Sequence, residues 1–177
     1  MDFDNLKEAY GRLVYTHKTY EKAADMEDYK QRIVLWTNLF LIILSALGIV
    51  ITGYIANPLV SFASPLITVF TFGFVTYQLT FRPDERARSY RVTARDLRDL
   101  RDRYINLLID IKCKRLSDNQ IVDRRDHLGE ALAIIYKYAL PTNAKAYKKA
   151  QKALQIDEEF SFSDNEVDVF LPKNLRG

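Results

Sequence analysis

The sequence has few of the residues from which enzymatic and metal sites are built. It has one cysteine, Cys113, so no disulfide can form within the chain and nothing requires an oxidising compartment. Two histidines and that cysteine do not make a metal-ligand cluster. The six glycines do not cluster, which excludes a glycine-rich phosphate loop. We also find no paired carboxylates and no Ser/His/Asp set, and we expect neither an enzyme nor a cofactor.

Charge is missing from one long stretch. The chain has 177 residues with 26 Lys and Arg and 23 Asp and Glu, yet none of these and no histidine falls within 33–81. In a soluble domain, surface loops and helix faces would interrupt an uncharged stretch of this length. Two membrane spans of about 20 residues each fit it. The sequence therefore excludes an ordinary soluble globular protein.

Two antiparallel helices account for the uncharged stretch. The first span is expected over 33–55, and Asn57-Pro58 marks a turn. The second span is expected over 58–81 with a bend at Pro65, and the shorter alternative starts at Pro65 itself. Because the connecting loop is short, residues 33–81 are predicted to form a transmembrane hairpin.

Positive charge flanks the hairpin on both sides. By the positive-inside rule, both termini are expected in the cytoplasm and the protein is expected to be a multi-pass membrane protein. Eight arginines follow between Arg82 and Arg103, but five acidic residues in the same segment mostly cancel them, so we expect no nucleic acid to bind directly. Arg82, Arg86 and Arg88 are assigned to anionic lipid headgroups.

Polar residues in the two spans follow helical spacing. The second span carries one stripe of Ser61, Ser64, Thr68, Thr71 and Gln78, and the first span has Asn38, Ser45, Gly48 and Thr52 on one face. Small and hydroxyl residues let two helices approach and hydrogen-bond, so both sets can be packing residues. Alternatively the second-span stripe lines a water-filled path in an oligomer while the first-span set packs, and both interpretations can hold together. The spans contain no ionisable residue, which argues against an ion-coupled transporter.

The remaining sequence predicts cytosolic helices. Residues 1–32 form an amphipathic helix, with His17 on its apolar face as a packed core histidine. Residues 82–156 predict a helical bundle, and 157–177 form an acidic, then apolar tail without a helical period. The predicted fold class is an all-α membrane protein, with a two-helix transmembrane hairpin plus a cytosolic helical bundle.

Caps and apolar faces define three helices in the bundle. The first begins at Pro83 and runs to about Leu116. The second follows a capping box over 117–120, and the third is capped by Thr142 or Asn143. The predicted inward positions are Tyr90, Leu97, Leu100, Tyr104, Leu107, Leu108 and Ile111 on the first helix, and Ala146, Tyr147, Ala150 and Leu154 on the third.

This layout resembles that of a known family. An N-terminal helix, a tight hairpin of two spans with an arginine-rich exit, and a helical C-terminal bundle are similar to the SLATT family, the SMODS- and SLOG-associating two-transmembrane effector domain. Local similarity lies in 131–154, with its helix break at Pro141-Thr142 and its face of Tyr147 and Ala150, and in the tail from Glu158 through Glu166 to Leu171-Pro172-Lys173 and Leu175.

The resemblance implies an effector of a bacterial anti-phage or nucleotide-signalling conflict system, located in the bacterial inner membrane. Such effectors are encoded beside nucleotide-messenger synthases, sensors or reverse transcriptases and assemble pores that kill the infected cell. The trigger would then come from a separately encoded partner. A pore also requires a homo-oligomer in the lipid bilayer, because two helices enclose no lumen. The alternative is a non-enzymatic membrane anchor that positions a cytosolic partner enzyme.

Overall fold

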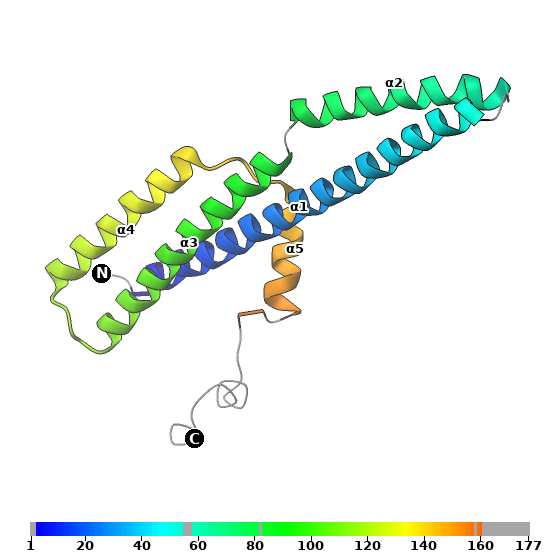
Figure 1. The fold of residues 1–177 in the computed structure, drawn as a ribbon. Helices are drawn as coiled ribbons and strands as arrows, with labels where there is room; N and C mark the ends of the chain where they lie inside the picture. The colour runs from blue at the N-terminus through cyan, green and yellow to red at the C-terminus, as the bar shows by residue number, and fades with distance from the viewer. Residues whose placement is uncertain (1–2, 55–57, 82, 158, 161–177) are drawn as a thin grey trace, which may run out of the picture. The chain divides into compact units, whose positions relative to one another are not determined.

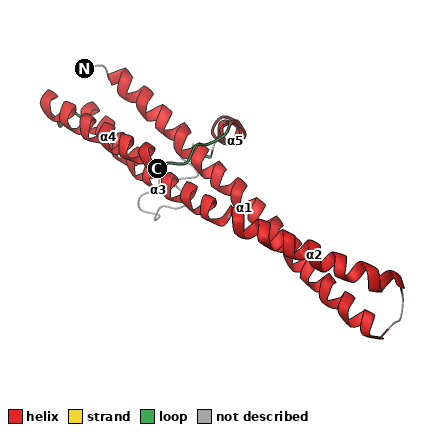
Figure 2. Ribbon diagram, turned by 90° about the horizontal axis from the view of Figure 1, so that it is seen from above, coloured by secondary structure: helices red, strands yellow, loops and turns green. Residues whose placement is uncertain are grey.

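The computed structural model describes residues 3–54, 58–81, 83–157 and 159–160, and these form helices joined by turns (Figures 1 and 2). No strand occurs among them. The prediction of an all-helical chain is therefore confirmed for the described part. The five helices are α1 (Phe3–Tyr54), α2 (Pro58–Phe81), α3 (Pro83–Lys112), α4 (Asp118–Tyr138) and α5 (Ala144–Gln155).

The helices belong to two compact units. One unit comprises Met1–Ala23 and Arg91–Gly177, and the other comprises Ala24–Tyr90. Helix α1 contributes to both units because it is one unbroken helix of 52 residues. The predicted boundaries at residues 32 and 81 mark the ends of the expected membrane spans, and the one at residue 156 marks the end of the expected bundle. They are defined differently from the two compact units, so they stay predictions.

The first unit has a core of leucine, aromatic and alanine side chains. On α3 the predicted inward residues Leu97, Leu100 and Tyr104 are at most 5% exposed. On α5 the buried residues are Ala146, Ala150 and Ala153, whereas Tyr147 is 50% exposed. The prediction that Tyr147 points inward is wrong, because α5 packs through its alanines and the ring instead lies beside Tyr15, with ring centroids 6.1 Å apart. The core also includes Leu6, Leu13, Tyr20, Leu107 and Leu128.

Local signals set the ends of the bundle helices. Helix α3 ends at Lys112 rather than near Leu116, because Lys114 adopts a φ of 53°, which is incompatible with a continuing helix. The predicted capping box precedes α4, where the backbone N–H of Ser117 donates to Oε1 of Gln120 at 2.9 Å. Of the two predicted caps for α5, Asn143 is the one used, and its Oδ1 accepts the backbone N–H of Ala146 at 2.9 Å.

In the second unit, the C-terminal half of α1 and helix α2 run side by side in opposite directions (Figure 1). Helix α2 begins at Pro58 and includes Pro65, which corresponds to the longer of the two alternatives, while Asn57 lies outside the described residues. Two helical stretches are long and apolar enough to cross a membrane by length and composition, one in α1 and one that includes most of α2.

The hairpin is apolar on the outside and polar on the inside. Large side chains such as Trp36, Phe62 and Phe72 are each more than 70% exposed. Among the described side chains of 33–81, only Ser64 and Thr71 are buried. This arrangement is the reverse of a water-soluble helix pair, whose apolar side chains face each other.

Replacing Leu97 by alanine tests the core of the first unit. Leu97 is fully buried, so L97A should lower the free energy of unfolding by about 2–5 kcal/mol. The matched control is I109A on the same helix, where Ile109 is 47% exposed and the loss should be much smaller. Circular dichroism during denaturation in detergent micelles measures both. Equal losses would contradict this description of the core.

Candidate functional site

The two span helices meet along a seam of small polar side chains. The hydroxyls of Ser45 on α1 and Thr71 on α2 are 3.1 Å apart and share a hydrogen bond. One turn further along α1, a Cβ built on Gly48 would lie 2.7 Å from Oγ of Ser64 and 3.3 Å from its Cβ. Gly48 therefore permits an approach that any larger residue would obstruct, as small residues do at membrane helix interfaces.

An amide pair continues this seam toward the charged end of the hairpin. Nδ2 of Asn38 donates to Oε1 of Gln78 at 3.3 Å. Oδ1 of Asn38 is buried and has no hydrogen-bond partner among the described residues. A buried amide oxygen without a partner carries a free-energy penalty, so this end of the seam is the least satisfied part of the helix contact.

The structure divides the stripe predicted for α2 between two surfaces. Ser64, Thr71 and Gln78, spaced by sevens, lie on the seam against α1. Ser61 and Thr68 are exposed instead, and they line an open groove of about 520 Å³. The groove is also lined by Ile49, Thr52, Gly53, Ser64, Pro65 and Val69. In one chain the stripe is thus partly a packing surface, and the water-filled path through an oligomer stays a prediction.

Five threonine hydroxyls in the hairpin donate to backbone carbonyls of their own helices. Thr52 donates to the carbonyl of Gly48 at 2.7 Å, and Thr68 donates to that of Ser64 at 3.0 Å. The hydroxyl of Thr76, on the exposed surface of α2, donates to the carbonyl four residues earlier at 2.9 Å. Each hydroxyl proton is therefore satisfied without water, as a lipid environment requires. Thr71 and Thr80 make the same i−4 bond.

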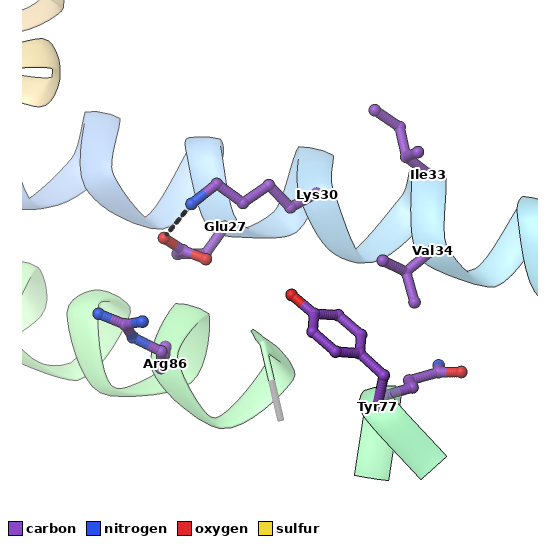
Figure 3. A pocket seen from close by; sticks show the side chains of 7 residues that line it. Glu27, Lys30, Ile33, Val34, Tyr77 and Arg86 are labelled. Carbon is purple, nitrogen blue, oxygen red and sulfur yellow. Dashed lines mark hydrogen bonds and ion pairs between the residues drawn. The ribbon is translucent and has the colours of Figure 1, made fainter. Parts of the chain in front are cut away.

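A pocket of about 320 Å³ lies at the charged end of the hairpin (Figure 3). Glu27 and Lys30 of α1 form an ion pair of 2.7 Å on its wall, and Tyr77 of α2 and Arg86 of α3 also line it. Its remaining lining residues are Ile33, Val34 and Gln78. Of the residues predicted to contact lipid headgroups, Arg86 and Arg88 are exposed, and Arg82 lies outside the described residues.

The first unit contains a cluster of cationic side chains that the sequence reasoning missed. Lys18 is only 6% exposed, and its ammonium group pairs with Glu21 at 2.8 Å and with Glu159. Lys22 pairs with the other oxygen of Glu159 at 2.7 Å. The imidazole of His17 is 1% exposed, and its Nε2 lies 3.4 Å from Glu21. His17 is thus packed as predicted, and it belongs to a charged cluster.

Phe160 completes this cluster from the turn after α5. Its ring stacks on the imidazole of His17, with centroids 5.7 Å apart and planes inclined by 16°. The ammonium of Lys18 lies 4.6 Å from the ring centroid, and the guanidinium of Arg101 on α3 lies 5.0 Å from it. Cations at these distances are attracted by the negative faces of aromatic rings. The sequence signal was weak, because Glu159 and Phe160 lie in a segment without periodicity.

The contacts shift three pKa values in the cluster. The hydrogen bond from His17, together with that from Lys18, lowers the pKa of Glu21 to about 2, although partial burial opposes the shift. Hydrogen bonds from Lys18 and Lys22 lower the pKa of Glu159. Burial acts against the charged form of Lys18, but hydrogen bonds to Glu159 and Glu21 outweigh it and raise its pKa. These contacts therefore favour the charged forms of Glu21, Glu159 and Lys18.

The described residues contain no group of three or more His, Cys, Asp or Glu side chains that could hold a metal ion. Cys113 is exposed and free. His127 makes two contacts on an exposed face of α4, with nitrogen–oxygen distances of 3.6 Å to Asp123 and 3.7 Å to Glu130. Exposed pairs of this kind are ordinary surface contacts.

Enlarging Gly48 tests the seam. G48L should separate the spans because its side chain would overlap Ser64, whereas G73L on α2 should not, since nothing lies within 4 Å of a Cβ at Gly73. In a C113S background, cysteines at Ser45 and Thr71 should form an intrachain disulfide that reports the contact. G48L should reduce the disulfide yield several-fold. An unchanged yield would contradict this seam.

Acidification tests the Glu21 cluster. The folded-state pKa of Glu21 is about 2 against an ordinary 4.5, so its contribution to stability is present above pH 4.5 and is lost as the pH falls toward 2. Glu159 contributes in the same direction. The melting temperature followed by circular dichroism should fall over this interval, and E21Q should reduce the pH dependence. An E21Q chain with the wild-type pH dependence would contradict the assignment.

Comparison with protein families agrees with the two-span layout. The sequence model of SMODS and SLOG-associating 2TM effector domain family 4 matches residues 3–166, a range that includes all five helices. No curated protein and no solved structure gives a significant match. The resemblance inferred from the sequence is therefore confirmed, and the chain belongs to the SMODS and SLOG-associating two-transmembrane effector domain family.

Proposed function

We propose that this chain is the membrane effector of a bacterial anti-phage or nucleotide-signalling conflict system. In this proposal it forms an oligomeric pore that disrupts the membrane and kills the cell when a separately encoded partner triggers it. The family description supports the effector role and the association with a partner. The observation that carries the proposal is the hairpin itself, with apolar side chains outside and small polar side chains at its seam.

The exposed apolar surface supports membrane insertion. Leu59, Val69 and Phe70 are each at least 65% exposed, and each Å² of such surface removed from water contributes about 25 cal/mol. Trp36 and Tyr77, near the charged end of the hairpin, are suited to the headgroup region. The exposed Arg86 and Arg88 lie just beyond α2, where anionic lipid headgroups would meet them. In this topology both termini are cytoplasmic.

A path across the membrane requires several copies of the hairpin. Two helices enclose no lumen, and the seam of one chain is closed by the Ser45–Thr71 and Asn38–Gln78 contacts. We propose that the described arrangement corresponds to a closed state, and that the trigger favours an oligomer in which the α2 stripe faces a common path. The exposed Ser61 and Thr68 would face it without any change in the seam. The partner must bind one state more tightly to shift the population.

Replacing one of two similar threonines at a time tests whether the α2 stripe lines a path or only packs. Thr68 and Thr76 are both exposed on α2, and both donate to the carbonyl four residues earlier, but only Thr68 belongs to the stripe. T68L should reduce dye efflux from liposomes at least several-fold, because it lines the path with an apolar side chain. T76L should leave efflux at the wild-type level. Membrane insertion of both variants is checked by flotation.

The same experiment distinguishes a pore from an anchor. Liposomes are prepared at increasing protein-to-lipid ratios, and cells producing the chain with its genomic neighbours are followed with a membrane-potential dye. Efflux that rises steeply with the ratio, and loss of potential in the cells, support an oligomeric pore. Intact potential and no efflux at any ratio contradict it and favour a membrane anchor for a partner enzyme. Equal efflux through T68L and wild type contradicts the path-lining role alone.

A further inference from the structure

The cluster around Lys18 contacts Glu159 and Phe160 of the same chain in the way that a binding site contacts a ligand. Its inner wall is buried, with His17 at 1% and Lys18 at 6% exposure. Its occupant is much more exposed, since the side chain of Glu159 retains 34% of its accessible surface and Phe160 retains 37%. The occupant is a dipeptide in a turn, whereas the wall belongs to two long helices, so the pair can leave without removing a core residue.

The cations of the cluster need an anion in the place of the Glu159 carboxylate whenever that carboxylate leaves. These cations are Lys18, Lys22 and Arg101, and the acidic side chains paired with them are Glu21, Glu159 and Asp102. Departure of Glu159 would leave three cations with two carboxylates, and one of those cations is buried. A buried ammonium with too little opposite charge is costly. An anion that replaced the Glu159 carboxylate would remove that cost.

The ring contacts define the second part of the ligand. Phe160 is a flat ring stacked on His17, with the ammonium of Lys18 and the guanidinium of Arg101 near its face. These three groups act on the π-face of the ring and do not depend on a phenylalanine side chain. Nδ1 of His17 is also buried, and it has no hydrogen-bond partner among the described residues.

We propose that His17, Lys18, Lys22 and Arg101 form a binding site for a ligand that joins an anionic group to a flat aromatic ring, and that Glu159 and Phe160 occupy this site in its absence. The anion replaces the Glu159 carboxylate between Lys18 and Lys22, and the ring replaces Phe160 on His17. Binding displaces the turn after α5. This inference goes beyond the proposed function and does not depend on pore formation.

Phenyl phosphate tests the site, because it joins a doubly charged anion to a ring and nothing more. Calorimetric titration in detergent micelles compares the wild-type chain with E159A/F160A, whose helical content is checked by circular dichroism. E159A/F160A should bind phenyl phosphate about tenfold more tightly than wild type, since the Glu159 and Phe160 side chains no longer compete for the site. Inorganic phosphate should bind it about tenfold more weakly than phenyl phosphate, because the ring contacts are missing.

Two lysines provide the matched comparison. In the E159A/F160A background, K22A removes a cation of the site and should weaken phenyl phosphate binding about tenfold. K148A removes an exposed lysine of α5 and should leave it unchanged. Equal affinity of wild type and E159A/F160A, equal affinity for the two phosphates, or no effect of K22A would each overturn the proposal.

A tryptophan at position 160, in a chain that keeps Glu159, provides a second test if E159A/F160A does not fold. W36F/F160W retains an aromatic ring on His17 and leaves one tryptophan in the chain, at the occupant position. Phenyl phosphate should make this tryptophan accessible to iodide, and inorganic phosphate at the same concentration should do so much less. Unchanged quenching at saturating phenyl phosphate would show that the turn is not displaced and would overturn the proposal.

Discussion

A polypeptide in hydrocarbon has to satisfy its own backbone hydrogen bonds, and the proposed membrane location places the hairpin under this constraint. Residues 33–54 and 58–81 meet it as two long helices, and their uncharged sequence leaves no side chain that needs water strongly. In a bilayer, large apolar side chains would gain nothing by facing each other, because lipid would surround them equally well. The contact surface is left to the small polar residues, which is why Ser64 and Thr71 are the buried ones.

The two units therefore use opposite principles of packing. The first unit buries leucines, aromatics and alanines, as a water-soluble domain does, and places most of its ion pairs on exposed surfaces. The second unit exposes its large apolar residues and joins its helices through hydroxyl, amide and glycine contacts. Helix α1 takes part in both, so the composition of its contact face changes along its length from the buried Leu13 and Tyr20 to the partly exposed Ser45 and Gly48.

Features that depend on neighbouring residues were predictable from the sequence. The Ser117 capping box, a cap at Thr142 or Asn143, and the buried face of α3 follow from local patterns, and the family follows from the order of the segments along the chain. Features that depend on how helices pack against one another were not predictable from the sequence. The stripe on α2 has a single helical spacing, yet the contact with α1 follows a seven-residue repeat and leaves Thr68 outside. Likewise Lys18 and Glu159 are far apart in the sequence, and nothing in the pattern around either predicts their pairing.

The hydroxyl groups of the spans have a consequence for how easily the helices exchange neighbours. A polar group bonded across an interface must lose its partner when that interface opens, and in lipid no water replaces it. Thr52, Thr68 and Thr76 instead keep their protons on their own helix whichever surface they face. Separation of the two spans would break the described bonds of Asn38 and Ser45 but would leave these three in place. Most of the described hydroxyl bonds of the hairpin would thus survive an exchange of neighbouring helices.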